Sequence, residues 1–549
     1  MSTVRVAALS LFAFVLAACK VGPNFVAPNE PVPDHYSGAT NDSAGAAVSR
    51  SSEDSIPMSF WWQQFHDTEL DHLEERAVDG NLDLKAAFVR IVAARLQVQS
   101  ARAQGLPNLN ASASFTREQL GLAGILKSQG FQGGTTTSAI TQRLIAALER
   151  PVNIYQLGFD ASWELDLFGK VSREVEAANA QSAGAVESRN DLLVSLEAEV
   201  AQIYFQLRAG QVLRQIQLDL IAAQRDVLDL INDRHEHGLA GEADVDSARA
   251  QLSSLQSQLP LYEQTIAMSK HALAVLTGQA PEALDAEFGE TGELPALPET
   301  IPVGLPSTLT RRRPDIRHAE TALHTATAQI GVSVASLFPD VSLSGTYGAR
   351  NLGTGYLFDW QSKFYTFGPS ISIPIFHGGA VVANIRLSRA LEAEAAMNYR
   401  KTVLNALQEV EDGLINLHED ALRTASLRET VTADQRALDL DLDSYRHGLM
   451  SYINVLTAQL QTVQARQQLA QSLLTQSIDL VKLYKALGGG WEESPSVAHA
   501  IDSGVNARSS FQLPTSSVPN RKPISISVRR DMPRQMTVFP GGASRVRFG

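Results

Sequence analysis

Residues 193–230 read LVSLEAEVAQIYFQLRAGQVLRQIQLDLIAAQRDVLDL, and this stretch decides the fold. Its apolar residues recur at alternating spacings of three and four, the heptad spacing of a coiled-coil seam. No proline interrupts residues 171–232, so the pattern predicts a single helix of roughly 90 Å at 1.5 Å per residue. A compact single domain does not need so long a rod.

The helical pattern occurs twice along the chain. A His-Gly-Leu turn ends the first rod at residues 237–239, and a second His-Gly-Leu turn occurs at residues 447–449, an offset of about 210. The two halves also end alike, in Leu-Thr-Gly at 276–278 and Ala-Leu-Gly at 486–488. We therefore predict an internal duplication, in which each turn glycine takes a positive φ and reverses the chain. Pro260 should kink the first return helix or break one of its backbone bonds.

Strand-like segments precede each long helix. Apolar and polar residues alternate with period two in four segments, which are 108–115, 156–164, 341–347 and 367–375. Period two gives a strand one apolar and one polar face, and these lengths suit a tilted strand that crosses a bilayer. Short alternating strands beside helices also describe a soluble two-layer domain, so that alternative stays open here.

The N-terminus reads as a lipoprotein signal. Residues 1–18 carry one basic residue followed by an apolar run that is too short for a membrane span. The run ends in Leu-Ala-Ala-Cys, which resembles the bacterial lipobox, so we expect diacylglyceryl and N-acyl chains on Cys19. The alternative is an ordinary signal with an incidental cysteine. Lys20 follows in place of the aspartate that marks inner-membrane retention, so the resemblance implies the outer membrane.

Composition excludes several classes of function. The 549 residues carry a net charge of -13, which argues against a nucleic-acid partner. The single cysteine excludes an intrachain disulfide and a thiolate metal cluster. His235 and His237 lack a third metal ligand at suitable spacing, and no phosphate-binding loop occurs. We therefore expect no enzyme activity, no metal and no cofactor besides the covalent lipid.

Four strands in one chain predict an oligomer. A sheet in hydrocarbon must close, because each unpaired backbone group costs several kcal/mol there, and the smallest membrane barrels have about eight strands. A dimer would supply eight strands and little lumen, whereas a trimer would supply twelve and an open pore. Closed cyclic symmetry would also give the helical hairpins neighbours on both sides. The rods would then continue the β-barrel as an α-helical barrel suited to crossing the periplasm.

Several motifs stand out along the chain, which are Cys19 to Pro28, Trp61-Trp62 with Phe65, Asp67 and Leu70, residues 81–84, Arg312 to Ile316 with Ala319, Glu320, Ile330, Gly331, Phe338 and Pro339, and Ala486 to Trp491. Together they resemble the outer membrane factor family, the TolC-like exit ducts, and in particular its lipoprotein branch. The resemblance implies a mixed α/β membrane protein, a homotrimer with a 12-stranded β-barrel (four strands per chain) and a long α-barrel. Its function would be the passive exit duct of a tripartite efflux pump, with a periplasmic adaptor (membrane fusion) protein and an inner-membrane transporter of the proton-driven RND type.

Two other functions stay open from the sequence. The chain could serve as the duct of a type I protein secretion system, or as a membrane-tethered coiled-coil scaffold. The expected organisation is a signal peptide (1–18), an extended lipid-anchored strap (19–58), a first repeat (59–278), a linker (279–310), a second repeat (311–491) and a disordered basic tail (492–549). The glycine-rich regions 130–134 and 353–355 are expected to be exposed loops between paired strands.

The resemblance also implies a gate where the hairpins converge. Asp244 stands at the family's acidic latch position and Tyr445 at that of its tyrosine partner. The family often has an aspartate where this chain has Thr457, with Asn454 at the neighbouring latch position and Met450 where some members have arginine. The acidic ring would then have to come from Asp244, alone or with Asp246, or be weaker. The alternative is that all of these are solvated turn residues. The candidate adaptor-docking residues at the tips are His237, Gly238, Leu239, His447, Gly448 and Leu449.

Overall fold

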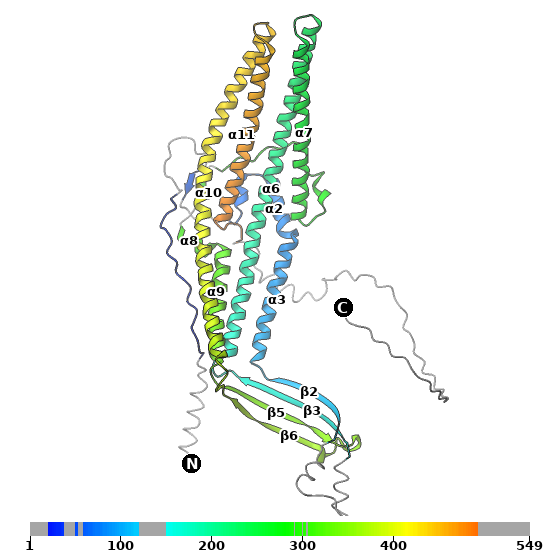
Figure 1. Ribbon diagram of the computed structural model, residues 1–549, viewed down its shortest axis with the longest axis vertical. Helices are drawn as coiled ribbons and strands as arrows, with labels where there is room; N and C mark the ends of the chain where they lie inside the picture. The colour runs from blue at the N-terminus through cyan, green and yellow to red at the C-terminus, as the bar shows by residue number, and fades with distance from the viewer. Residues whose placement is uncertain are drawn as a thin grey trace, which may run out of the picture. The chain divides into compact units, whose positions relative to one another are not determined.

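Two long helical hairpins dominate the computed structural model, which describes residues 20–37, 50–52, 59–119, 150–289, 291–298, 300–302 and 306–491. The first hairpin is α6 (Lys170–Glu236) with α7 (Glu242–Leu276), and the second is α10 (Ala380–Arg446) with α11 (Tyr452–Ala486). Figure 1 shows the hairpins side by side, and α6 packs against α11. The first helix of each hairpin has 67 residues and the second has 35. Each helix of the second hairpin begins 210 residues after its counterpart.

The elements that precede each hairpin include the same series of a helix and two strands. The helices are η1 (Trp61–Phe65), α2 (Thr68–Gly80), α3 (Leu82–Gln104), η2 (Pro281–Leu284), α8 (Pro306–Arg312), α9 (Pro314–Ala335), η3 (Thr354–Tyr356) and η4 (Trp360–Ser362). The strands are β1 (Arg50–Ser52), β2 (Asn108–Glu118), β3 (Val152–Leu165), β4 (Thr300–Pro302), β5 (Asp340–Asn351) and β6 (Lys363–Ser372). A helix, two strands, a 67-residue helix and a 35-residue helix therefore follow one another twice.

The turn glycines have the expected conformation. Gly238 has a φ of 70° and Gly448 a φ of 75°, which confirms the prediction of positive φ at both reversals. Leu239 donates its N–H to the Arg234 carbonyl at 2.7 Å, and Leu449 donates its N–H to the Ser444 carbonyl at 2.9 Å. These bonds satisfy carbonyl groups that the end of each helix would otherwise leave unpaired.

The return helix α7 continues through Pro260. Proline removes one N–H donor from the helix and crowds the preceding turn. The long helix on either side and its packing against α6 are sufficient to keep the helix continuous.

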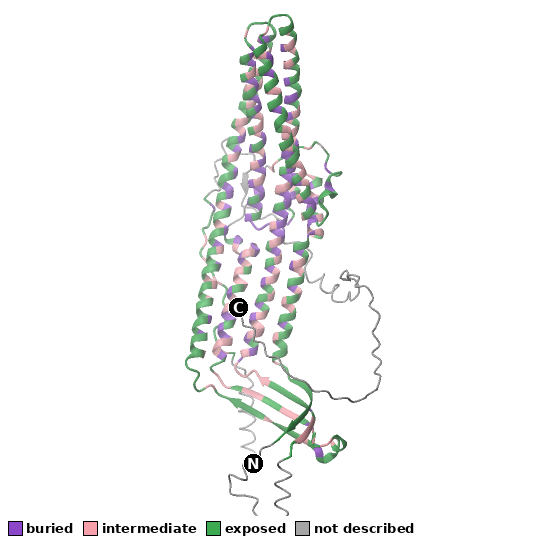
Figure 2. Ribbon diagram, turned by 45° about the vertical axis from the view of Figure 1, so that its right-hand side comes forward, coloured by how far each residue is buried: buried purple, intermediate pink, exposed green. Residues whose placement is uncertain are grey.

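Four strands form one antiparallel sheet in the order β2-β3-β5-β6. The register keeps the alternation in phase across all four strands, because Phe159 lies opposite Ala111 and Tyr347 while Asp160 lies opposite Asn110 and Thr346. One face of the sheet is therefore apolar and the other polar. Phe159 is 53% exposed, and Figure 2 shows that exposed residues prevail along these strands.

Strand β6 is shorter at its C-terminal end than the sequence predicted. It ends at Ser372, which pairs with Asp340, the first residue of β5. Ile373 and Ile375 therefore lie outside the sheet, and the prediction that the strand runs to residue 375 is wrong. The partner strand has ended at this point, and Pro374 has no N–H to offer a neighbouring strand.

An aromatic core joins η1 to both hairpins. The Trp61 ring stacks on that of Tyr484 with centroids 5.1 Å apart, and Phe65 packs on Phe205 at 4.9 Å. Trp61, Phe205 and Tyr484 are each 1% exposed or less. The core thus connects η1 with α6 of the first half and α11 of the second.

The strap contains one element that the sequence did not predict. Strand β1 pairs in parallel with β4, with Ser51 opposite Ile301. The residues for which lipidation (Cys19), a loop (130–134) and a disordered tail (492–549) were predicted lie outside the described residues. Gly353 and Gly355 lie between β5 and β6, as expected for a loop between paired strands. Among the helices that the structure describes, none combines the length and apolar character needed to span a bilayer.

Candidate functional site: the hairpin tips

The two hairpin tips carry the same histidine cap. His237 lies with Nδ1 2.7 Å from the carbonyl oxygen of Asp233, and His447 lies with Nδ1 2.8 Å from that of Asp443. A carbonyl oxygen only accepts, so Nδ1–H is the donor in both tips. The hydrogen bond to the Asp233 carbonyl, followed by the charge of the Asp233 carboxylate, raises the pKa of His237.

The outermost side chains of both tips are exposed. Leu239 is 68% exposed and Leu449 is 80% exposed. An added Cβ at Gly238 would meet nothing within 4 Å, so its positive φ is what requires glycine there. Each tip thus offers an imidazole and an apolar side chain to solvent. His235 turns back to the Ala240 carbonyl at 3.0 Å, and no group of three or more His, Cys, Asp or Glu side chains could hold a metal in the described part of the chain.

Three of the predicted gate residues have only local contacts. Asp246 forms an exposed ion pair with Arg249 at 3.0 Å. Thr457 donates its hydroxyl to the Ile453 carbonyl one turn earlier at 2.8 Å, and Asn454 is exposed. A single protomer therefore does not bring these three side chains together.

Asp244 lies near Tyr445 without bonding to it. Its carboxylate accepts the N–H of Gly241 at 3.2 Å, which caps α7. Burial raises the pKa of Tyr445, the Arg234 charge opposes this, and the Asp244 charge raises it further. Asp244 also raises the pKa of Tyr452, after burial and against the effect of a Gln224 hydrogen bond. Within the described part of this protomer, no hydrogen bond joins the Asp244 carboxylate to the Tyr445 hydroxyl.

Arg234 connects the two hairpins, a role that the sequence analysis missed. Its guanidinium lies 4.5 Å from the centroid of the Tyr445 ring, and its Nη1 donates to the Tyr445 carbonyl at 2.7 Å. Tyr445 is only 4% exposed, so the cation rests on a buried aromatic face. Arg234 occupies the last turn of α6, where a basic residue also complements the helix dipole.

Gln224 forms a second connection between the hairpins. Its side chain is fully buried, and Nε2 donates to the Ala248 carbonyl at 3.0 Å and to the Tyr452 hydroxyl at 3.3 Å. Burial of a glutamine in an apolar seam raises the free energy of the folded state unless its side chain is hydrogen-bonded. The position of Gln224 in the seam therefore indicated in the sequence that this side chain has a partner. The apolar side chains around both connections are Val227, Ile231, Val245, Ala248, Tyr445, Tyr452 and Val455, which come from both hairpins.

The duplicated hairpins, the in-phase sheet and the turn geometry occur together with a match to one sequence family. Residues 73–279 and 305–489 match the outer membrane efflux protein family. The chain belongs to this family.

Relatives of this outer membrane efflux protein match it over most of its length. The antibiotic efflux pump outer membrane protein ArpC of Pseudomonas putida is 31% identical over 495 residues, which cover 89% of this chain and 96% of ArpC. Nodulation protein T of Rhizobium leguminosarum bv. viciae is 30% identical over 523 residues, covering 94% of this chain and 100% of that protein. The solved outer-membrane channel OprN superposes with a TM-score of 0.74 at 32% identity, covering 86% of this chain and 100% of OprN.

These findings confirm the family predicted from the sequence. They also confirm the predicted function, an efflux channel of the outer membrane.

Proposed function

We propose that three copies of this chain form a passive exit duct, with a 12-stranded β-barrel that continues into an α-helical barrel. The observation that carries the proposal is the four-stranded sheet with two open edges. Among the described strands, β2 pairs only with β3, and β6 only with β5. Pairing β6 of one copy with β2 of the next would satisfy both edges and place the apolar face toward lipid.

Exposed apolar residues on the helices support the same assembly. On α10, Leu387, Leu391, Met397 and Leu404 are between 49% and 72% exposed. On α3, the exposed apolar residues are Leu82, Val89 and Leu96. Apolar surface of this extent needs a partner in water, and a ring of identical copies supplies one.

The anchor and the chain divisions remain part of this proposal. Residues 1–18 are the signal peptide, and Cys19 carries the diacylglyceryl and N-acyl chains that fix the strap 19–58 to the outer membrane. Residues 59–278 and 311–491 are the two repeats, joined by the linker 279–310 and followed by the tail 492–549. The duct uses no cofactor and catalyses no reaction.

The hairpin tips form the gate and the docking surface. Asp244 and Tyr445 form the latch, and Asp246, Asn454 and Thr457 line the constriction once three copies converge. The Asp244 charge raises the pKa of Tyr445, which supports this pairing. The exposed His237, Leu239, His447 and Leu449, turned outward at Gly238 and Gly448, contact a periplasmic adaptor protein. An inner-membrane transporter of the RND type supplies the energy, consistent with the pump named for ArpC.

Conductance of the purified protein in a planar bilayer tests the duct. We expect discrete ion-conducting steps from protein that cross-links as a trimer. Protein that forms trimers and stays silent in both the native form and the latch variant Asp244→Ala would contradict the proposal.

Removing the lipid separates the duct from a tethered scaffold. The variant Cys19→Ala should stay in the membrane fraction after a high-salt wash, because the barrel itself holds it there. Release of a stable, water-soluble protein would favour the scaffold.

A further inference from the structure

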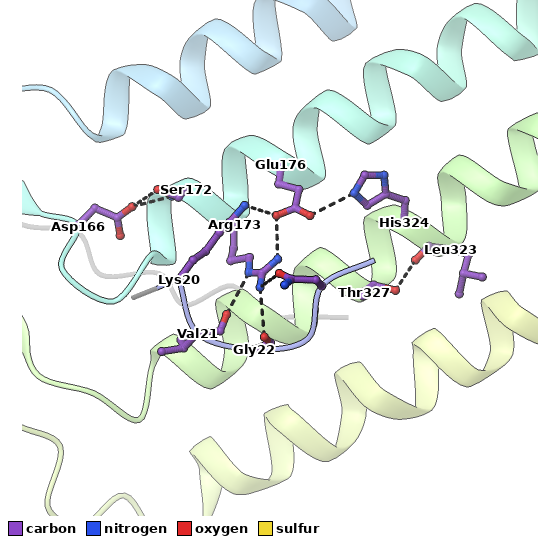
Figure 3. Close-up of polar contacts among 11 residues, drawn as sticks. Lys20, Val21, Gly22, Asp166, Ser172, Arg173, Glu176, Leu323, His324 and Thr327 are labelled. Carbon is purple, nitrogen blue, oxygen red and sulfur yellow. Dashed lines mark hydrogen bonds and ion pairs between the residues drawn. The ribbon is translucent and has the colours of Figure 1, made fainter. Parts of the chain in front are cut away.

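Residues 20–25, here called the strap segment, bind a group of side chains on two helices, here called the socket, although most of the segment's own residues are exposed. The socket consists of Arg173 and Glu176 on α6 and His324 on α9, which Figure 3 shows, together with Gly331 on α9. This segment belongs to the N-terminal motif that the sequence analysis singled out, and neither the channel nor the gate makes use of it.

Arg173 directs most of its hydrogen bonds to the strap segment. Its Nε donates to the Val21 carbonyl at 3.0 Å, and Nη2 donates to the Gly22 carbonyl at 3.2 Å and to the Asn24 side chain at 2.9 Å. Its Nη1 donates to Glu176 at 2.9 Å. Arg173 is 1% exposed with the strap segment in place, so its charge is desolvated and depends on these hydrogen-bond partners.

Glu176 contacts three basic side chains, as Figure 3 shows. Besides Arg173, it accepts from Lys20 at the start of the strap segment and lies 3.2 Å from Nε2 of His324. Burial alone would raise the pKa of Glu176, but the hydrogen bonds from Lys20, His324 and Arg173 outweigh it and lower the pKa to about 2.

The close approach of the strap segment requires glycine on both sides. Gly22 has a φ of 88°, and a Cβ there would lie 2.5 Å from Cα of Gly331. A Cβ at Gly331 would in turn lie 2.7 Å from the Arg173 side chain. The backbone of the strap segment, α9 and Arg173 are thus packed against one another with no room for another carbon atom.

Two further contacts fix the ends of the strap segment. The Phe25 ring stacks on the His324 ring with centroids 4.3 Å apart and an angle of 12°. The Val21 N–H donates to the Phe168 carbonyl at 3.2 Å, in the short connection between β3 and α6. The segment therefore spans from the sheet junction of the first half to α9 of the second half.

We propose that the strap segment is a docking peptide, recognised through Lys20, Gly22, Asn24 and Phe25, that ties the first half of the chain to the second beside the sheet. This role is independent of the lipid on Cys19 and of the gate. The competing view is a passive tether, whose only task is to connect the lipid to the folded chain.

Hydrogen exchange of the full-length protein distinguishes a docked peptide from a tether. Gly22→Ala keeps every charge but adds the excluded carbon atom, and Glu176→Gln keeps the shape but removes the charge. Each should make the amides of residues 20–22, 24 and 25 exchange roughly tenfold faster. Val26→Ala is the matched control, because Val26 is 81% exposed beside the segment and should change nothing. Unchanged exchange in both socket variants would overturn the proposal.

A double-mutant cycle addresses the case in which Gly22→Ala fails to assemble. Lys20→Met and Glu176→Gln retain the backbone, and both act on the same ion pair. If the strap segment is recognised as proposed, the double variant should exchange no faster than Glu176→Gln alone. Effects that simply add would show that Lys20 and Glu176 are not coupled, which would refute recognition at position 20.

Discussion

Arg234 and Tyr445 lie 211 positions apart in the chain, yet the Arg234 guanidinium covers the Tyr445 ring at 4.5 Å and bonds its carbonyl at 2.7 Å. Each residue occupies the last turn of a 67-residue helix. This contact lies at the hairpin tips, at the end of both helices that is farther from the sheet. There it resists separation of the hairpins more effectively than the same contact near the sheet would.

Arg234→Met should increase the fraction of time for which the channel is open. The substitution removes a charge-assisted hydrogen bond and a cation–π contact, which together contribute about 2–5 kcal/mol per protomer. Single-channel recording should show a larger open fraction than in the native protein. Arg225→Met is the matched control, because Arg225 is an exposed arginine on the same helix. Equal open fractions in both variants would show that Arg234 does not restrain the tips.

Asp244→Ala should also open the channel, and Asp244→Asn separates the two possible causes. The carboxylate caps α7 at the Gly241 N–H and places a negative charge near Tyr445. Asparagine retains the cap without the charge. Opening in both variants would indicate the charge, and opening in Asp244→Ala alone would indicate the cap.

Tyr445→Phe tests the hydroxyl of the latch separately. The variant keeps the ring under Arg234 and removes only the oxygen that a latch with Asp244 would use. We expect a larger open fraction in planar bilayers, because a hydrogen bond to a carboxylate contributes about 1.5–3 kcal/mol. A native-like open fraction would exclude a Tyr445 hydroxyl latch.

Gly80→Ala should destabilise the first repeat severely. A Cβ at Gly80 would lie 2.0 Å from the Thr277 carbonyl oxygen, where α2 meets the end of α7. Relieving such a clash requires movement of the backbone, and a cost of at least about 3 kcal/mol is expected. Thermal unfolding should show the loss. Gly289→Ala, where an added Cβ meets nothing within 4 Å, should unfold like the native protein.

Acid should weaken the contacts of the strap segment because it protonates Glu176. Its pKa is about 2 in the folded chain, below the ordinary value of 4.5, so its contribution to stability is complete above 4.5 and is lost as the pH falls towards 2. The native protein should therefore be more stable than Glu176→Gln above pH 4.5, and the difference should shrink on acidification. Melting temperatures of both proteins across this range would measure it, and a constant difference would contradict the assigned pKa.

The periodic features could be predicted from the sequence because they depend on neighbours along the chain. The heptad spacing, the offset between the turns and the alternation around Phe159 each follow from local geometry. That alternation also restricts the register of the sheet. A slip by one residue would place the polar residues of a strand on the apolar face. The end of β6 was missed because it depends on where β5 begins.

The contacts that join the two halves could not be predicted from local pattern. Whether Arg234 reaches Tyr445, or Gln224 reaches Tyr452, depends on how two long helices are rotated against each other. The socket around Arg173 likewise depends on chain segments roughly 150 residues apart meeting at one point. No spacing rule connects such residues, although a buried polar residue in an apolar seam indicates that a partner must exist.

The equal lengths of the paired helices restrict how such a chain can change during evolution. An insertion of one heptad in α6 alone would make its tip extend beyond the tip of α10. Arg234 would then no longer contact Tyr445. A compensating insertion would be needed in α7, α10 and α11 as well. The length of the hairpins should therefore change in all four helices together. Homologues should then differ by whole heptads in these helices rather than by single residues.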